Sequence, residues 1–287
     1  MKFNLKALVA AVALSATAMS ANAAIEQGTA TATGSDFVFS AWDSVAGVGY
    51  TYDLNWNKYL SDFIGADASA NAAGNATVLN NAKVATSLVG AGGVIFDDVL
   101  TGLPFGADTS NVQWSLGAFD NGGRTRMLIT KDVTDVAAFA PTSNNVKAAV
   151  TGFSSYAAAS NDFIVGPAAS DYALDGYAVT SDTNGAGYAG NMGNAFVNNL
   201  SDTTNTLGSQ SFMYFLAQST QASSNLAALQ QQLKTVNGDS IVVKTYQQGG
   251  QWRLNIAAVA AVPEPESYAM FLAGLGLMGF IARRRKA

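Results

Sequence analysis

The sequence of 287 residues contains neither cysteine nor histidine. Without cysteine the chain can form no disulfide, so a folded domain must depend on its own apolar core. Zinc or copper sites built on histidine and cysteine are excluded, as are Ser-His-Asp and Cys-His catalysis. The patterns S-x-x-K and G-x-S-x-G, which are common in serine hydrolases, do not occur either. An enzyme of this sequence would have to use carboxylates, lysine, tyrosine or a serine–lysine pair.

Charged residues are also scarce, at 12% of the chain. Residues 24–262 hold nine Lys and Arg against eighteen Asp and Glu, a formal charge of −9, and Glu26 is their single glutamate. This balance argues against nucleic acid or anionic lipid as a partner. A glycosidase of this composition would be expected to use two aspartates. The adjacent Asp97 and Asp98 cannot be that pair, because neighbouring side chains in a strand point to opposite faces; we expect solvated turn or strand-end aspartates.

The C-terminus combines a rigid turn, an apolar stretch and a basic end. Pro263, Glu264 and Pro265 resist helix and favour an extended segment that a protease could bind. Residues 267–282 would reach roughly 24 Å as a helix, less than the roughly 30 Å hydrocarbon core, so a membrane span needs help from its flanks. The basic end, residues 283–286, predicts a cytoplasmic C-terminus. The alternative is a buried C-terminal helix of a globular domain.

This tail resembles the PEP-CTERM sorting signal of Gram-negative bacteria. The residues that carry the resemblance are Val262, Pro263, Glu264, Pro265, Leu272, Gly274, Leu275, Gly279, Phe280, Arg283, Arg284 and Arg285. The resemblance implies processing by exosortase, a membrane-embedded cysteine-type transpeptidase, and delivery to the cell surface or the surrounding matrix. Proteins with this tail are typically associated with exopolysaccharide, biofilm and floc formation, and some ice-binding proteins carry it.

The N-terminus has the pattern of a secretory signal peptide. Lys2 and Lys6 precede an apolar region at 7–18, and Ala21 and Ala23 form a small-x-small cleavage site. We predict a mature N-terminus at Ala24, with the Sec translocon and signal peptidase as partners and a transient passage through the inner membrane. The alternative, a cytoplasmic amphipathic helix, is disfavoured because the apolar residues run continuously.

These signals divide the chain into four predicted parts. They are a signal peptide at 1–23, an exported domain at 24–257, a linker at 258–262 and a sorting signal at 263–287 with a transmembrane helix at 267–282. Between the signals, 239 residues are enough for one large domain or two small ones.

The exported region is predicted to be an α+β domain, mainly antiparallel and sandwich-like, with inserted helices. Strands are expected at 36–43 and 48–54, and hairpins at 112–131 and 240–257. In the last hairpin Trp252, Leu254 and Ile256 should face one side, and Arg253 and Asn255 the other. Helices with core-facing apolar stripes are expected at 143–159 and 224–236. Residues 37–54 also resemble the opening of other PEP-CTERM proteins, which implies a shared fold and no activity.

Two patterns raise the question of a bound ligand. The turns Asp182 to Gly185 and Asp120 to Gly122 have the oxygen-rich composition of Ca²⁺ sites, but neither completes a calcium loop, and we favour plain turns without a cofactor. Glycines 185, 187 and 190 fit G-x-G-x-x-G, the dinucleotide-binding pattern. No acidic residue follows about 20 positions on, so we reject a dinucleotide site.

Three functions remain open. The leading hypothesis is a non-enzymatic surface or matrix protein that contacts exopolysaccharide or its own copies. A second is a secreted carboxylate-based hydrolase acting on polysaccharide. A third is an ice- or carbohydrate-binding module, prompted by threonines 29, 31 and 33 on one strand face. Trp42, Trp56 and Trp114 could stack on sugars, although tryptophans in strands are more often core residues.

Overall fold

The computed structural model describes residues 25, 35–54, 60–64, 75–121, 124–131, 140–164, 176–197, 200, 204–219 and 224–260. The predicted signal peptide, its cleavage residues Ala21, Ala23 and Ala24, and the sorting signal lie outside these residues. Among the described residues, no helix has the length and apolar character needed to cross a membrane.

The described residues are mostly β, in a single 13-stranded sheet. The strand order is β3-β11-β12-β9-β6-β5-β1-β2-β7, while β13 pairs with β12, β4 with β13, β10 with β9 and β8 with β5. The strands are β1 Val38–Asp43, β2 Val48–Asp53, β3 Lys83–Val84, β4 Val94–Val99, β5 Val112–Asp120, β6 Arg126–Lys131, β7 Gly176–Ser181, β8 Asn205–Thr206, β9 Gln210–Ala217, β10 Leu229–Gln232, β11 Lys234–Thr235, β12 Ser240–Gln248 and β13 Gln251–Val259. The pairing is antiparallel except between β11 and β3, so the sheet is mixed.

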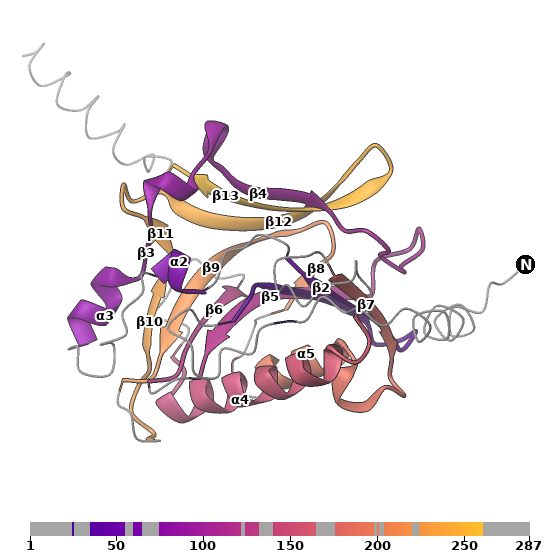
Figure 1. Ribbon diagram of the computed structural model, residues 1–287, viewed down its shortest axis with the longest axis horizontal. Coiled ribbons are helices and arrows are strands. Elements are labelled where there is room, and N and C mark those ends of the chain that lie inside the picture. The colour runs from indigo at the N-terminus through magenta and orange to yellow at the C-terminus, as the bar shows by residue number, and fades with distance from the viewer. Residues whose placement is uncertain are drawn as a thin grey trace, which may run out of the picture.

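Within the described residues, the helices are few and short apart from one. They are α2 Leu60–Ile64, α3 Asn75–Asn81, α4 Ser143–Ser160 and α5 Gly190–Val197, with 3₁₀ turns η1 Thr86–Leu88, η2 Ala91–Gly93 and η4 Gly185–Gly187. In Figure 1, β12, β13 and β4 lie above the strands from β9 to β7, and α4 and α5 lie below them. The sheet therefore folds over itself, and the helices add a third layer.

The space between the two halves of the sheet is an aromatic core. Phe39, Tyr50 and Trp114 are fully buried there, and Leu254 and Ile256 reach it from β13 above. Phe39 stacks on Trp114 with 5.7 Å between ring centroids. These residues alternate along their strands with residues that face the helices, which is the period-2 pattern of a strand covered on both sides.

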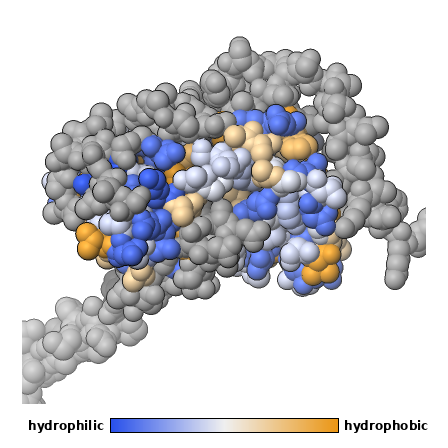
Figure 2. All heavy atoms as spheres, turned by 90° about the horizontal axis from the view of Figure 1, so that it is seen from below, coloured by the Kyte–Doolittle hydropathy of each residue, from blue (hydrophilic) through white to orange (hydrophobic). Residues whose placement is uncertain are grey.

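The helix α4 forms where it was predicted, and it covers the lower face of the sheet. Its N-cap Thr142 and Asn145 form a reciprocal capping box, which satisfies two free backbone N–H groups at the helix start. The predicted apolar stripe is buried and consists of Val146, Ala149, Val150, Phe153 and Ala157. Figure 2 shows this side of the molecule, where hydrophilic residues intermix with weakly and strongly hydrophobic ones among the described atoms.

The prediction of a helix at 224–236 is wrong. Residues 229–232 form β10, which pairs with β9, and residues 234–235 form β11. Leu229 and Leu233 are buried, but Leu226 is 61% exposed, so the three leucines share no face. The Gln231 amide donates to the carbonyls of Leu79 and Ala82, at 2.6 and 2.8 Å. Strand pairing and these bonds override a leucine spacing that is typical of a helix.

The predicted hairpins are confirmed, with one difference in burial. β5 pairs with β6 and β12 with β13, both antiparallel. Leu254 and Ile256 face the core and Trp252 is half-buried at its margin, while Arg253 faces outward. Asn255 also faces outward but is only 5% exposed, because its amide bonds to residues of β4. β13 continues to Val259, two residues into the segment interpreted as a linker.

Candidate functional site

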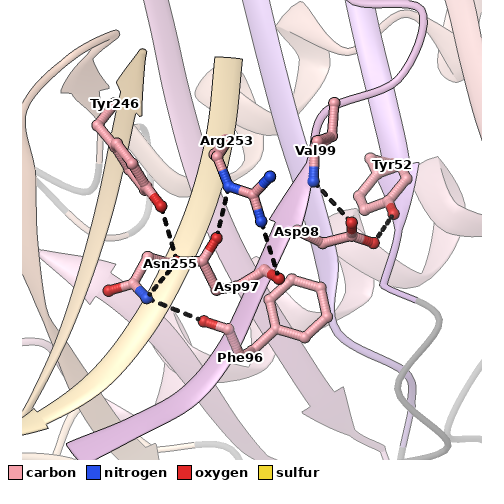
Figure 3. A network of polar contacts seen from close by, with 8 residues as sticks. All are labelled: Tyr52, Phe96, Asp97, Asp98, Val99, Tyr246, Arg253 and Asn255. Atoms are coloured by element: carbon pink, nitrogen blue, oxygen red, sulfur yellow. Dashed lines mark hydrogen bonds and ion pairs between the residues drawn. The ribbon is translucent and has the colours of Figure 1, made fainter. Parts of the chain in front are cut away.

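A network of polar contacts lies on the outer face of β4, β13 and β12 (Figure 3). Its centre is the Asp97 carboxylate on β4. Oδ2 accepts hydrogen bonds from the Tyr246 hydroxyl at 2.7 Å and the Asn255 amide at 3.1 Å, and Oδ1 accepts one from Arg253 Nε at 2.7 Å. The Asn255 amide also donates to the Phe96 carbonyl at 3.2 Å. One carboxylate therefore joins three strands.

The bonds to Asp97 determine its protonation. Partial burial would raise the pKa of Asp97, but the hydrogen bonds from Tyr246, Arg253 and Asn255 and the Arg253 charge together hold it below the ordinary value. Burial and the Asp97 hydrogen bond raise the pKa of Tyr246. A general acid in glycoside hydrolysis needs a raised carboxyl pKa. Asp97 has the opposite shift, and its hydrogen bonds link β4 to β13 and β12, so the cluster is suited to holding these strands together.

Asp98 points to the other face of β4, as expected for neighbouring residues in a strand. It accepts hydrogen bonds from the Tyr52 hydroxyl at 3.1 Å and from the Val99 N–H at 2.7 Å. Figure 3 shows the two carboxylates on separate sides of the strand. Both lie near the end of β4, but both are hydrogen-bonded, whereas we expected simply solvated side chains.

Of the three candidate stacking tryptophans, the two that the structure describes are buried. Trp114 is fully buried and its indole N–H donates to the Thr206 carbonyl at 2.8 Å. Trp42 is 3% exposed and packs with the apolar residues between the sheet and the helices. It also borders a cavity. Trp56, like threonines 29, 31 and 33, lies outside the described residues. Of the three candidate stacking residues, Trp42 is the one with a described cavity beside it.

The two oxygen-rich turns are held by bonds within the protein. Asp120 is buried and forms an ion pair with Arg126, the residue opposite it on β6. In the other turn the side-chain oxygen Oδ1 of Asn184 accepts hydrogen bonds from the Ser181 N–H at 2.6 Å and from the Ser181 hydroxyl at 3.1 Å. Across the part of the chain that the structure describes, no three acidic residues gather where they could hold a metal ion.

The glycine pattern at 185–190 lies between β7 and α5 and includes η4. A dinucleotide fingerprint requires a parallel βαβ unit. β7 instead pairs antiparallel with β2. The antiparallel pairing of β7 is thus a structural reason to reject a dinucleotide site.

Sequence reasoning missed the partners of Asp97. Tyr246, Arg253 and Asn255 converge on Asp97 only because β4 pairs with a hairpin about 150 residues later, and no local pattern encodes that pairing. The alternation in β13 did place Arg253 and Asn255 on one face. It could not show which group that face meets.

Comparison with known proteins gives one match. The family described as the PEP-CTERM protein-sorting motif matches residues 261–286, the segment that contains Pro263, Glu264, Pro265, Arg283, Arg284 and Arg285. No curated protein and no solved structure matches the chain significantly. The motif indicates an exported protein that exosortase processes and sorts to the cell surface. The resemblance seen in the tail is confirmed: this chain carries a PEP-CTERM protein-sorting motif.

Proposed function

We propose that this protein is a non-enzymatic surface or matrix component, structural or adhesive in exopolysaccharide. The observation that carries the proposal is the sorting motif at 261–286, because it indicates the compartment in which the folded part works. Exosortase is the processing partner. The proposed binding partner of the mature protein is the matrix polysaccharide. The signal peptide with cleavage before Ala24 and the transient membrane helix at 267–282 belong to the same proposal.

The described fold supports a binding or structural role. Two of its carboxylates link neighbouring strands: Asp97 joins β4 to β13 and β12, and Asp120 joins β5 to β6. Asp43 Oδ1 accepts the N–H groups of Val45 and Ala46 at 2.8 and 2.9 Å and so fixes the β1–β2 turn. These contacts account for the three aspartates without any reaction.

The sorting step is tested in the native host by comparing two neighbouring glutamates. Glu264 lies between the two prolines of the motif, and Glu266 follows it with the same charge and size. Glu264→Ala should leave the protein in the membrane fraction, whereas Glu266→Ala should reach the surface or matrix. Deletion of residues 263–287 serves as the full-loss reference. An unchanged distribution of the Glu264→Ala variant and the deletion among cells, membrane, matrix and medium would refute the sorting step.

The matrix role is tested separately by binding to the host's own polysaccharide. The protein should co-sediment with purified exopolysaccharide, and a knockout strain should form a weaker biofilm that the wild-type gene restores. A correctly exported protein that neither binds the polysaccharide nor changes the biofilm would exclude the structural or adhesive role while leaving sorting intact.

A further inference from the structure

The fourth tryptophan of the chain, Trp252, borders a cavity of about 460 Å³. The cavity lies between the segment that follows β4 and the tip of the β12–β13 hairpin, which meet at one end of these strands (Figure 1). Its described lining consists of residues 99–103, 105–107, 247 and 250–252. Small-molecule sites in proteins usually measure about 300 to 1,000 Å³. The cavity therefore has room for a ligand of one or two rings.

Strand geometry places the Trp252 ring at the edge of the core. Trp252 shares its face of β13 with Leu254 and Ile256, which are fully buried, while Trp252 itself is half-buried. One end of its indole packs over Gly208, where a Cβ would lie 3.6 Å from the ring. The apolar stripe that fills the core thus ends in an aromatic ring that is partly open to the cavity.

The hairpin sets an amide beside this ring. Gln247 lies directly opposite Trp252 in the register of β12 and β13, so the two side chains share one face of the sheet. The two residues of the turn, Gly249 and Gly250, have positive φ angles of 60° and 80°. Such a pair forms the type I′ turn that keeps a tight hairpin in register. Gln247 is exposed, so its amide is accessible to a ligand.

The opposite wall of the cavity is fixed to the lower strands. The Tyr50 hydroxyl donates to the Thr101 carbonyl at 2.7 Å. Gly102, with a φ of 75°, lies so close to Tyr177 of β7 that a Cβ would come within 2.4 Å of its ring. Phe105 follows on the same wall, half-buried against the core, and gives the lining a second aromatic ring. A wall held in this way needs little ordering when a ligand binds.

We propose that this cavity binds a hexose ring of a polysaccharide, a step that rests on the proposed matrix function and names its contact site. The apolar C–H face of the sugar packs against the open part of the Trp252 ring and against Phe105. The Gln247 amide and the Thr101 hydroxyl can each donate and accept hydrogen bonds, as sugar hydroxyls do. Aromatic rings beside such groups suit a ligand with an apolar face and hydroxyls around its edge.

The test is isothermal titration calorimetry on the purified full chain in detergent, with the neutral hexaoses of β-glucan, α-glucan and β-mannan as probes. At least one hexaose should bind. Gln247→Ala should weaken that binding about three- to tenfold, as expected for the loss of one hydrogen bond. The matched control is Gln248→Ala, which removes the next glutamine of β12; it is also exposed but faces the other side of the sheet. This control should bind like the unchanged protein.

A second variant fills the cavity and removes no binding group. A Cβ on Gly106, which belongs to the lining, would meet no described atom within 4 Å. Gly106→Leu should therefore fold and occupy space that the sugar needs, so it should weaken binding more than Gly106→Ala does. Trp252→Leu, which keeps an apolar side chain at the edge of the core, should weaken binding about tenfold. Circular dichroism checks that each variant is folded.

The proposal is overturned if none of the hexaoses binds at millimolar concentration, or if the folded Gln247, Gly106 and Trp252 variants all bind normally. Equal losses from Gln247→Ala and Gln248→Ala would overturn it too. A decaproline peptide is titrated in parallel, because aromatic grooves also bind extended proline-rich segments; binding of this peptide without any hexaose would have the same consequence. Sorting and co-sedimentation with the host's exopolysaccharide are measured on the unchanged protein, so their outcomes separate failure of the matrix role from failure of this cavity.

Discussion

Two aspartate–arginine pairs join strands of this sheet in different surroundings. Asp120 and Arg126 face each other directly across β5 and β6, and their side chains are 5% and 7% exposed. Asp97 and Arg253 meet diagonally across β4 and β13, with side chains 27% and 25% exposed. Burial makes the first pair costly to leave half-formed, whereas water already solvates much of the second.

The outer ion pair is part of a wider set of hydrogen bonds. The Asp97 carboxylate accepts hydrogen bonds from Tyr246 and Asn255 as well as from Arg253. These bonds add to an ion pair that alone contributes little at a solvated surface. The inner pair is screened far less by water and salt. Thus similar residues serve a local hairpin in one place and a three-strand connection in the other.

Removing one charge of the inner pair should have the largest effect. Asp120→Asn leaves Arg126 buried beside a neutral amide and should lower the free energy of unfolding by about 3–5 kcal/mol. Urea unfolding of the full chain, followed by near-UV circular dichroism, measures this loss. A loss below 1 kcal/mol would mean that the Arg126 charge reaches water or another acceptor.

Replacing both charges of the inner pair should cost much less than replacing one. The double variant Asp120→Leu/Arg126→Met removes both charges of the pair, so neither is left buried without the other, and stability should return to within about 2 kcal/mol of the unchanged protein. The single changes Asp120→Leu and Arg126→Met complete a double-mutant cycle. Additive single effects would contradict direct coupling of the two side chains.

The same change in the outer pair should have a small effect. Asp97→Asn keeps the shape of the side chain and some of its hydrogen-bond acceptors, so the loss should stay under about 1 kcal/mol. It should shrink further in 1 M salt, while the loss from Asp120→Asn should hardly change. Equal salt dependence at the two positions would show that burial does not distinguish them.

How far the sequence predicts this structure depends on the range of the interactions involved. Runs rich in strand-forming residues with a turn between them predicted the β1–β2 and β5–β6 strands, and the stripe from Val146 to Ala157 predicted α4. The leucine spacing at 226–233 failed because β10 is fixed by β9 and by Gln231, which bonds to carbonyls about 150 residues earlier.

The polar cluster around Asp97 and the cavity beside Trp42 show the same limit of short-range sequence patterns. Asp97 and Asp98 could be assigned to opposite faces from strand geometry alone. The cavity beside Trp42 could not be foreseen, because Trp42, Gln113 and the connection that holds Asp182 and Tyr188 are three separate segments that only the strand register and Gly49 bring together. The sorting motif, by contrast, is read from contiguous residues and needs no fold.

The smallest effect should appear in the pH dependence of the outer pair. The pKa of Asp97 is lower in the folded protein than its ordinary value. Folding therefore gains stability from Asp97 above the unfolded-state pKa, near 3.9, and loses it as pH falls through the lower folded value. Between pH 5 and pH 2 the unchanged protein should lose slightly more stability than Asp97→Asn. The difference should be below about 1 kcal/mol, because the carboxylate is partly solvated. Urea midpoints of both proteins across that range measure the difference. Parallel curves would mean that Tyr246, Arg253 and Asn255 stabilise the neutral amide as well as the carboxylate, and that the outer connection depends on hydrogen-bond geometry and not on charge.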